Sequence, residues 1–358
     1  MKIIHCADLH LDSKISRLPE KAAERRAELL NTFGRMIGYA KENFVTAIII
    51  AGDLFDTKNV SATAKNIVRD AIADNPQITF YYLRGNHDAD SFLAGMETAP
   101  QNLRLFGDEL ITYSHGKVKI TGAEMTGGHS RFCACLKLDP DDFNIVVLHG
   151  QVTESSAKNP EDIDLRELRN RNIDYLALGH IHAYREWVLD SRGRCCYPGC
   201  LEGRGFDECG DCGFVLLDID EETKTLKSQF ISFARRRLFE IKADISGLTK
   251  TSEIEAAVRA AAADCASDGL IKVVLVGEVD VECEKNLTQI ETDLGASFYF
   301  VKVTDHTRLR VDYNDYEHDI SLKGEFVRTV KARSDLSDEE KAAIIRYGFK
   351  VLAGEEVC

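Results

Sequence analysis

The sequence predicts an α/β protein, in which a sandwich of two sheets flanked by helices is followed by a smaller α/β domain. Three observations predict this fold. Before residue 103, apolar strand-like runs alternate with helical stretches, the pattern of βαβ units in a largely parallel sheet. After residue 103 the runs come too close together for helices between all of them, so a second, partly antiparallel sheet is expected. The alternation restarts after residue 234, and a chain of 358 residues is long for a single core.

Residues 1–234 are expected to form the sandwich. Continuous apolar runs predict strands that are buried on both faces. In the first sheet we expect strands at 3–6, 47–51 and 79–83, separated by helices at 20–43 and 62–74. In the second sheet we expect strands at 118–121, 145–148, 175–178, 185–189 and 214–219.

Residues 235–333 are expected to form the second domain. Its strands are expected at 238–245, 271–276 and 298–303, and its helices at 251–266 and 283–294. Residues 334–358 are expected to be a helical tail, because a serine followed by acids precedes an apolar periodic stretch at 338–352.

Composition limits the classes of partner. The chain has 45 basic and 59 acidic residues, a net charge of −14, which argues against tight nucleic-acid binding through a basic surface of its own. A polyanionic substrate would need local features, bound cations or a partner. No apolar run is long enough to span a membrane, and a strand pattern begins almost at the first residue without a signal-peptide region, so a cytoplasmic location is expected.

Eleven cysteines are expected to be mostly reduced thiols that behave as small apolar residues. One group leaves an alternative open, because Cys209-Gly-Asp-Cys212 has the spacing of half a zinc site. The residues that could complete a structural zinc site are Cys195, Cys196 and Cys200.

Five predicted strands carry metal-ligand side chains at their C-terminal ends. These side chains are Asp8 and His10, Asp53, Asn86 with His87 and Asp88, His149, and His180 with His182. Strand ends converge on one crevice in an α/β sheet, so we expect these groups to meet. Imidazole, carboxylate and amide ligands together suit Mn, Fe or Zn better than Ca, and their number suits two ions. Each residue alone could be a turn carboxylate or a core histidine, but five segments of one design favour a metal site.

These segments resemble the signatures of calcineurin-like metallophosphoesterases. The matching motifs are Asp8-Leu-His10, Gly52-Asp53-(x)2-Asp56, Gly85-Asn86-His87-Asp88, His149 and Gly179-His180-Ile-His182. Within that superfamily, residues 6–12 (CADLHLD) and 51–56 (AGDLFD) resemble DNA-repair nucleases of the SbcD/Mre11 type. Residues 321–328 (SLKGEFVR) are similar to the YhaO branch of these exonuclease-like proteins.

The resemblance implies a role for each of these residues. One metal ion is expected on Asp8, His10, Asp53 and His182, and a second on Asn86, His149 and His180, with Asp53 bridging the two. His87 is expected to act on the scissile phosphate or the leaving group. Asp56 is expected to support a ligand histidine, and Asp88 to orient the imidazole of His87.

The implied function is a phosphodiesterase with two divalent ions, Mn²⁺ before Fe or Zn, whose bridging hydroxide hydrolyses DNA as an exonuclease or endonuclease in DNA repair. The implied partners are DNA and an SbcC/Rad50-like coiled-coil ATPase, contacted through the second domain as a cap. Formation of a homodimer is left as an open alternative. Two alternatives are kept. One is a phosphodiesterase for cyclic nucleotides or nucleotide pyrophosphates with the same metal core, and the other is a non-catalytic subunit that binds a partner through the cap and tail.

Overall fold

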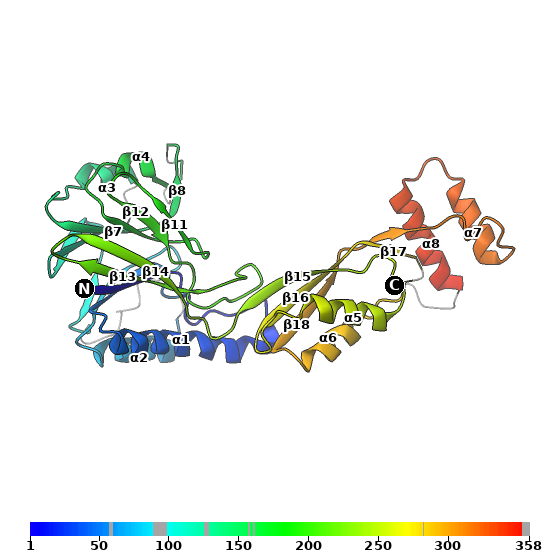
Figure 1. The fold of residues 1–358 in the computed structure, drawn as a ribbon, viewed down its shortest axis with the longest axis horizontal. Helices are drawn as coiled ribbons and strands as arrows, with labels where there is room; N and C mark the ends of the chain where they lie inside the picture. The colour runs from blue at the N-terminus through cyan, green and yellow to red at the C-terminus, as the bar shows by residue number, and fades with distance from the viewer. Residues whose placement is uncertain are drawn as a thin grey trace. The chain divides into compact units, whose positions relative to one another are not determined.

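We describe the protein from a computed structural model, which describes residues 1–56, 60–88, 99–124, 129–156, 158–159, 162–281 and 283–352. The chain divides into two compact units, Met1–Arg236 and Arg237–Cys358, and each is described by itself (Figure 1). In the described ranges, no helix is both long enough and apolar enough to cross a bilayer.

The first sheet of unit 1 has six strands in the order β14-β13-β1-β2-β3-β4. The strands are β1 (Lys2–Cys6), β2 (Ala47–Ala51), β3 (Thr79–Leu83), β4 (Leu103–Leu105), β13 (Gly213–Asp220) and β14 (Thr225–Ser232). Strands β1 to β4 are parallel, as expected from their βαβ pattern, and every residue of β2 is buried. Strand β13 pairs antiparallel with β1 and with β14. The prediction that residues 214–219 belong to the second sheet was therefore wrong, because this pairing depends on contacts between distant segments.

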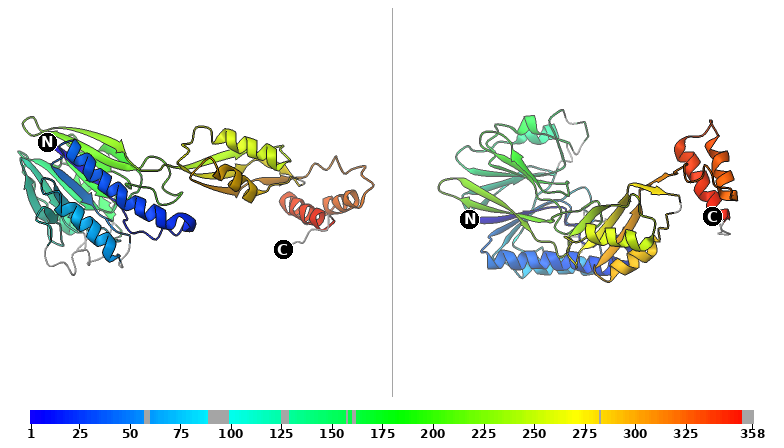
Figure 2. Two further views of the ribbon diagram at one scale, coloured as in Figure 1. Left: turned by 90° about the horizontal axis from the view of Figure 1, so that it is seen from below. Right: turned by 45° about the vertical axis from the view of Figure 1, so that its right-hand side comes forward.

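Two helices cover one face of this sheet, α1 (Ala22–Glu42) and α2 (Ala62–Ala73), after a short 3-10 turn at Pro19–Lys21 (Figure 2). In α1 the buried residues include Leu29, Phe33 and Met36, spaced three or four apart so that they share one helix face. Helix α2 begins where the side chain of Ser61 accepts a hydrogen bond from the amide of Ala64, which satisfies one of the first free amides of the helix.

The second sheet has the order β11-β12-β10-β7-β6-β5. Its strands are β5 (Ile111–His115), β6 (Val118–Gly122), β7 (Phe143–His149), β10 (Tyr175–Gly179), β11 (Arg185–Val188) and β12 (Arg194–Tyr197). The four inner strands are parallel, and β5 and β11 pair antiparallel at the two edges. Helices α3 (His129–Cys135) and α4 (Leu165–Leu168) lie in the connections between strands of this sheet, α3 before β7 and α4 before β10. In the connection between β7 and β10, β8 (Gln151–Thr153) pairs with β9 (Asp162–Asp164). The predicted two-sheet sandwich flanked by helices is confirmed.

The core of unit 1 lies between the two sheets. Ile3 and Ile49 from the first sheet pack with Ile145 and Val147 from the second. Alternate residues of the second sheet point to a separate outer cluster with α3 and α4. This alternation separates two neighbouring cysteines, because Cys195 lies in the outer cluster and Cys196 in the inner one.

The zinc alternative for the cysteines is therefore not supported in the described part of the chain. Cys200 and Cys212 lie close together, with their Sγ atoms 3.4 Å apart, whereas Cys209 is exposed. No group of three or more metal-capable side chains among the described residues includes any of these five cysteines. The physical reason is the strand pleat, which sends Cys195 and Cys196 to opposite faces.

Unit 2 contains a parallel three-stranded sheet in the order β15-β16-β18. Its strands are β15 (Leu238–Asp244), β16 (Leu270–Val276) and β18 (Phe300–Asp305), and they share a core with α5 (Thr251–Ala261) and α6 (Leu287–Gly295). Helix α6 begins later than expected, because the side chain of Asn286 accepts a hydrogen bond from the amide of Gln289 and caps the helix there. A short parallel pair, β17 (Glu278–Asp280) and β19 (Arg308–Arg310), follows.

The end of unit 2 is a pair of helices, α7 (Leu322–Lys331) and α8 (Asp338–Leu352). Val327 and Val330 of α7 pack with Ile345 and Phe349 of α8 in a small core. Helix α8 is the helix expected in the tail, and it packs on α7, which precedes residue 334. Residues 353–358 of the expected tail lie outside the described residues.

Candidate metal centre

The predicted ligands stand in the loops that follow β1, β2, β3 and β10, and His149 is the last residue of β7. Two hydrogen bonds tie the first two loops together: the amide of Asp8 donates to the carbonyl of Gly52 (3.1 Å), and the amide of His10 to that of Asp53 (2.9 Å). The backbone of Asp8, His10, Asp53 and His180 has positive φ angles of 51°, 44°, 50° and 108°. Residues other than glycine adopt this conformation at a cost, and such strain concentrates at functional sites.

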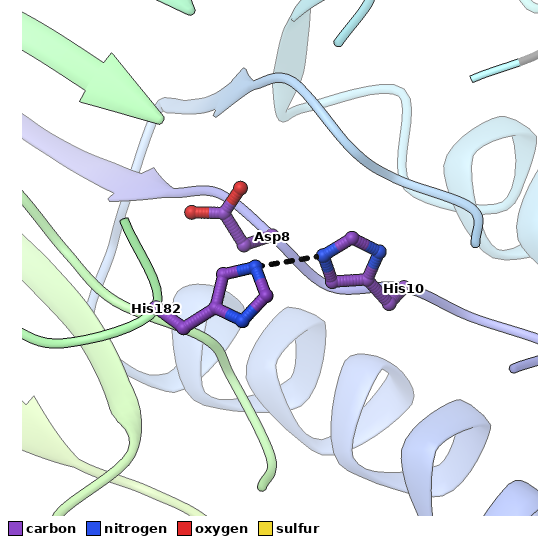
Figure 3. A group of neighbouring side chains, drawn as sticks. All are labelled: Asp8, His10 and His182. Atoms are coloured by element: carbon purple, nitrogen blue, oxygen red, sulfur yellow. Dashed lines mark hydrogen bonds between the residues drawn. The ribbon is translucent and has the colours of Figure 1, made fainter. Parts of the chain in front are cut away.

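One group of potential ligands consists of Asp8, His10 and His182 (Figure 3). The Nε2 atoms of His10 and His182 face each other at 3.1 Å. The carboxylate of Asp8 lies beside both rings and accepts a hydrogen bond from the amide of His180 at 2.9 Å. Asp8 and His10 are almost fully buried, and burial raises the pKa of Asp8 to about 6 in the absence of metal.

The outer nitrogens of these two rings face carboxylates. Nδ1 of His182 lies 2.8 Å from Oε1 of Glu208, and Nδ1 of His10 lies 3.1 Å from Oδ1 of Asp56, an ion-pair distance without hydrogen-bond alignment. A carboxylate partner favours the proton on Nδ1 and leaves the Nε2 lone pair free for a metal. Two Nε2 lone pairs that face each other at 3.1 Å repel unless a proton or a cation lies near both, so this group fits a divalent metal ion.

The second group consists of Asp8, Asp53 and His149. Nδ1 of His149 donates to the carbonyl of Ala51 at 2.9 Å, so Nε2 is the metal-facing atom. Nε2 lies 3.0 Å from Oδ1 of Asn86 and 3.5 Å from Oδ2 of Asp53. A lone pair that faces two oxygens needs a proton or a cation, so this group also fits a metal.

The charges of this second group depend on each other. Burial alone would lower the pKa of His149, but the hydrogen bond and charge of Asp53 raise it to about 9. Burial alone would raise the pKa of Asp53, but His149 first and then His10 lower it to about 2. Without metal, an imidazolium therefore balances the carboxylate, and a cation would take over that role.

Asp53 lies between the two groups. Its Oδ2 atom is 3.5 Å from Nε2 of His149 and 3.8 Å from Nε2 of His10, while Oδ1 accepts a hydrogen bond from the amide of His87 at 2.9 Å. Asp8 belongs to both groups as well, which sequence reasoning had not indicated. The ring of His180 packs edge-on against His149, with 5.4 Å between centroids, so the structure brings it to the second group.

His87 and Asp56 lie beside His10. The exposed ring of His87 packs edge-on against His10, with 5.2 Å between centroids, and the three residues form a further metal-capable group. Asp56 accepts hydrogen bonds from Ser13 Oγ (2.9 Å) and Arg204 Nη1 (2.7 Å). Burial alone would raise the pKa of Asp56, but His10, Arg204 and Ser13 hold it well below its usual range.

Asp88 has different partners from those expected. Its carboxylate accepts hydrogen bonds from the amides of Leu54 (3.2 Å), Phe55 (2.8 Å) and Gly85 (2.9 Å) rather than from the ring of His87. It thus joins the loop after β2 to the loop after β3. The described contacts give Asp88 this loop-fastening role, and the orientation of His87 by Asp88 stays a prediction.

Two charged residues near the site were missed by sequence reasoning. Glu208 contacts His182, and Arg204 bridges Glu208 and Asp56. Both lie in a loop after β12 rather than directly at a strand end, and Glu208 precedes the cysteine motif that suggested zinc. The available signal was an arginine and an acid four residues apart in a glycine-rich segment.

Residues 1–184, which include all of the predicted site residues, match the family model described as calcineurin-like phosphoesterase. The chain belongs to this family. A centre of two metal ions is typical of calcineurin-like phosphoesterases, and the His/Asp groups described above are of the kind such a centre uses.

A curated relative is the uncharacterized metallophosphoesterase YhaO of Bacillus subtilis (strain 168), which is 32% identical over 243 residues. The match covers 61% of this chain, and this chain spans 57% of the length of that relative. Similar solved structures include the protein TT1561 of Thermus thermophilus, with a TM-score of 0.42 and 14% identity over 64% of this chain and 98% of that one. Another is the calcineurin-like phosphoesterase YfkN from Bacillus subtilis, with a TM-score of 0.40 and 13% identity over 65% of this chain and 90% of that one.

Proposed function

We propose that the protein is a phosphodiesterase with two metal ions that acts on DNA as an exonuclease or endonuclease. The observation that carries the proposal is the position of Asp53 between two His/Asp groups whose Nε2 atoms point inward. Two adjacent divalent ions lower the pKa of water and neutralise phosphate charge during an in-line displacement.

The side chains divide between the two ions. Asp8, His10, Asp53 and His182 would hold the first ion, and Asn86, His149 and His180 the second, with Asp53 shared. Neutral imidazoles with carboxylate and amide oxygens form a ligand set that suits Mn²⁺, with Fe or Zn as alternatives. Asp56, Glu208 and the carbonyl of Ala51 would keep three of the imidazoles in the binding tautomer.

His87 would act as the general acid. Its amide is held by Asp53, while its ring is exposed next to His10. A side chain at this position can reach a phosphate at the metal centre without being a ligand. Protonated, it would donate to the leaving oxygen, and neutral, it would contact the phosphate.

The proposal of DNA as substrate rests on the resemblance of residues 6–12 and 51–56 to SbcD/Mre11-type nucleases. The net charge of −14 suggests that affinity for a polyanion comes from a partner. We propose an SbcC/Rad50-like coiled-coil ATPase for that role. Exposed apolar side chains on and before α7 and on α8 support a docking surface, and they include Ile320, Leu322, Tyr347 and Val351.

The substrate proposal is tested with the purified chain and Mn²⁺ on linear duplex and single-stranded DNA, beside cyclic nucleotides and a nucleotide pyrophosphate. DNA cleavage should occur and should be lost in Asp53→Asn and His87→Gln. His115→Gln is the matched control, because His115 bonds Tyr81 and Thr46 outside the site. If only the cyclic nucleotides or the nucleotide pyrophosphate are hydrolysed, the DNA proposal is wrong and the alternative substrate class takes its place.

The partner proposal is tested by co-purifying the chain with an SbcC/Rad50-like coiled-coil ATPase. Leu322→Asp and Val351→Asp should reduce complex formation in size-exclusion chromatography, whereas Asp53→Asn should not. If Leu322→Asp and Val351→Asp both form the complex as strongly as the wild type does, this surface is not the docking site.

A further inference from the structure

We propose that Arg204 and Glu208 are positioning residues that hold both imidazoles of the Asp8–His10–His182 group in the orientation needed for a metal ion. This inference rests on the metal binding in the proposed function. Glu208 contacts Nδ1 of His182, and Arg204 contacts Asp56, which faces Nδ1 of His10, so both residues act on the outer nitrogens of the two rings.

Glu208 is a buried carboxylate with a full set of partners. Its side chain is 2% exposed. Oε1 accepts hydrogen bonds from His182 Nδ1 (2.8 Å) and Arg204 Nη2 (2.7 Å), and Oε2 accepts one from the amide of Arg204 (2.6 Å). Removing a carboxylate from water is costly unless such partners compensate. Glu208 therefore gives His182 a fixed acceptor and fixes the tautomer of its ring.

Arg204 joins the partners of the two rings. Nη1 donates to Oδ1 of Asp56 at 2.7 Å, and the same oxygen lies 3.1 Å from Nδ1 of His10. Nη2 donates to Oε1 of Glu208, which holds His182. A guanidinium is planar and holds its donors in a rigid fork, so the two carboxylates keep one relative position. The orientations of the two imidazoles, 172 residues apart in sequence, are thereby coupled.

The loop that carries both residues is fastened at its start. Glu202 is 1% exposed and accepts hydrogen bonds from Arg25 Nη2 (2.8 Å), Thr32 Oγ1 (2.9 Å) and the amide of Arg235 (2.6 Å). These contacts tie the loop to α1 and to the last residues of unit 1. Arg204 and Glu208 therefore stand on a rigid support, as a positioning role requires.

The first test measures Mn²⁺ stoichiometry and affinity by equilibrium dialysis and metal analysis. In Arg204→Ala and Glu208→Gln, one of the two ions should bind about 10- to 100-fold more weakly, while the other is retained. Arg192→Ala is the matched control, because Arg192 also pairs with a carboxylate, Asp174, but outside the site. The control should bind both ions as the wild type does.

The second test is a double-mutant cycle on metal affinity. If Arg204 acts through the two carboxylates, Arg204→Ala should have a smaller effect in Glu208→Gln or Asp56→Asn than in the wild type. Arg204→Lys should not restore affinity, because a single ammonium cannot reproduce the fork. If Arg204→Ala fails to fold, the near-isosteric Glu208→Gln alone decides through its metal affinity.

The outcomes separate the two proposals. A wild-type protein that binds none of Mn²⁺, Fe²⁺ and Zn²⁺ refutes the proposed function. The other outcome is a wild type that binds two ions. If Arg204→Ala and Glu208→Gln then bind both ions with the affinity of the wild type, only the positioning role is refuted. Strictly additive effects in the double-mutant cycle also overturn it, because independent residues do not couple the rings.

Discussion

The Nε2 atoms of His10 and His182 face each other at 3.1 Å, while the outer nitrogen of each ring faces a carboxylate. Two imidazole nitrogens at this distance need a proton or a cation near both of them. One proton between the two nitrogens satisfies this contact in the metal-free protein, and a bound ion would take the place of that proton.

The first prediction is that metal stabilises the fold. At a free Mn²⁺ concentration of 100 times the dissociation constant, the free energy of unfolding should rise by about 2.7 kcal/mol. The measurement is denaturant unfolding in EDTA and in Mn²⁺. His10→Ala should show a smaller rise, and equal stability of the wild type under both conditions would speak against a metal site.

The second prediction concerns Asp53, which lies between both groups. Asp53→Asn should weaken the binding of both metal ions, since it removes the negative charge that they share. His182→Ala and His149→Ala should each mainly weaken the binding of one ion. Metal analysis after dialysis gives the stoichiometry, with His115→Gln as control. If one metal site stays fully occupied in Asp53→Asn, Asp53 does not bridge the two ions.

The third prediction separates His87 from the ligands. His87→Gln should bind both ions with unchanged affinity, because the ring is exposed and the contact with Asp53 comes from the backbone amide. The turnover number should nevertheless fall by about 10²- to 10⁴-fold, the usual contribution of general acid–base catalysis. Loss of a metal ion in this variant would reassign His87 as a ligand.

The fourth prediction uses Gly179, at the end of β10. A Cβ atom there would lie 1.8 Å from the carbonyl oxygen of Ala51 and 2.8 Å from Nδ1 of His149. Gly179→Ala should therefore cost about 3 kcal/mol of stability. Gly38→Ala is the control, because nothing lies within 4 Å of its Cβ position in α1, and it should stabilise by about 0.5–1 kcal/mol. Thermal or denaturant unfolding measures both.

The fifth prediction concerns pH. His5 is fully buried, with Nδ1 bonded to Tyr175 Oη and Nε2 to the carbonyl of Leu178, and burial lowers its pKa from 6.5 to about 3. Between these values the unfolded chain binds a proton that the folded chain does not. The contribution of a neutral His5 to stability is therefore complete above pH 6.5 and is lost as the pH falls towards 3.

This contribution has a slope of up to about 1.4 kcal/mol per pH unit. Denaturant unfolding in EDTA at several pH values should show a steeper acid loss in the wild type than in His5→Gln. Other groups titrate in the same window, and subtracting the variant removes them. Parallel curves for the two proteins would contradict the buried, neutral histidine.

Periodicity and ligand chemistry were sufficient to predict the fold class and the convergence of Asp8, Asp53 and His149. Both signals are local, since a buried strand is apolar throughout and its end carries the ligand. The loop-fastening role of Asp88 could not be predicted, because it depends on where the amides of Leu54 and Phe55 lie in space.

Long-range contacts were likewise beyond prediction from the pattern. The place of β13 beside β1 depends on antiparallel pairing between the two ends of unit 1. The bond between Arg204 and Asp56 joins residues 148 positions apart. Neither strand periodicity nor residue type encodes a partner at that distance, because many partners satisfy the same local pattern. Packing of the two sheets selects one of them, and so brings Arg204 and Glu208 to the outer nitrogens of His10 and His182.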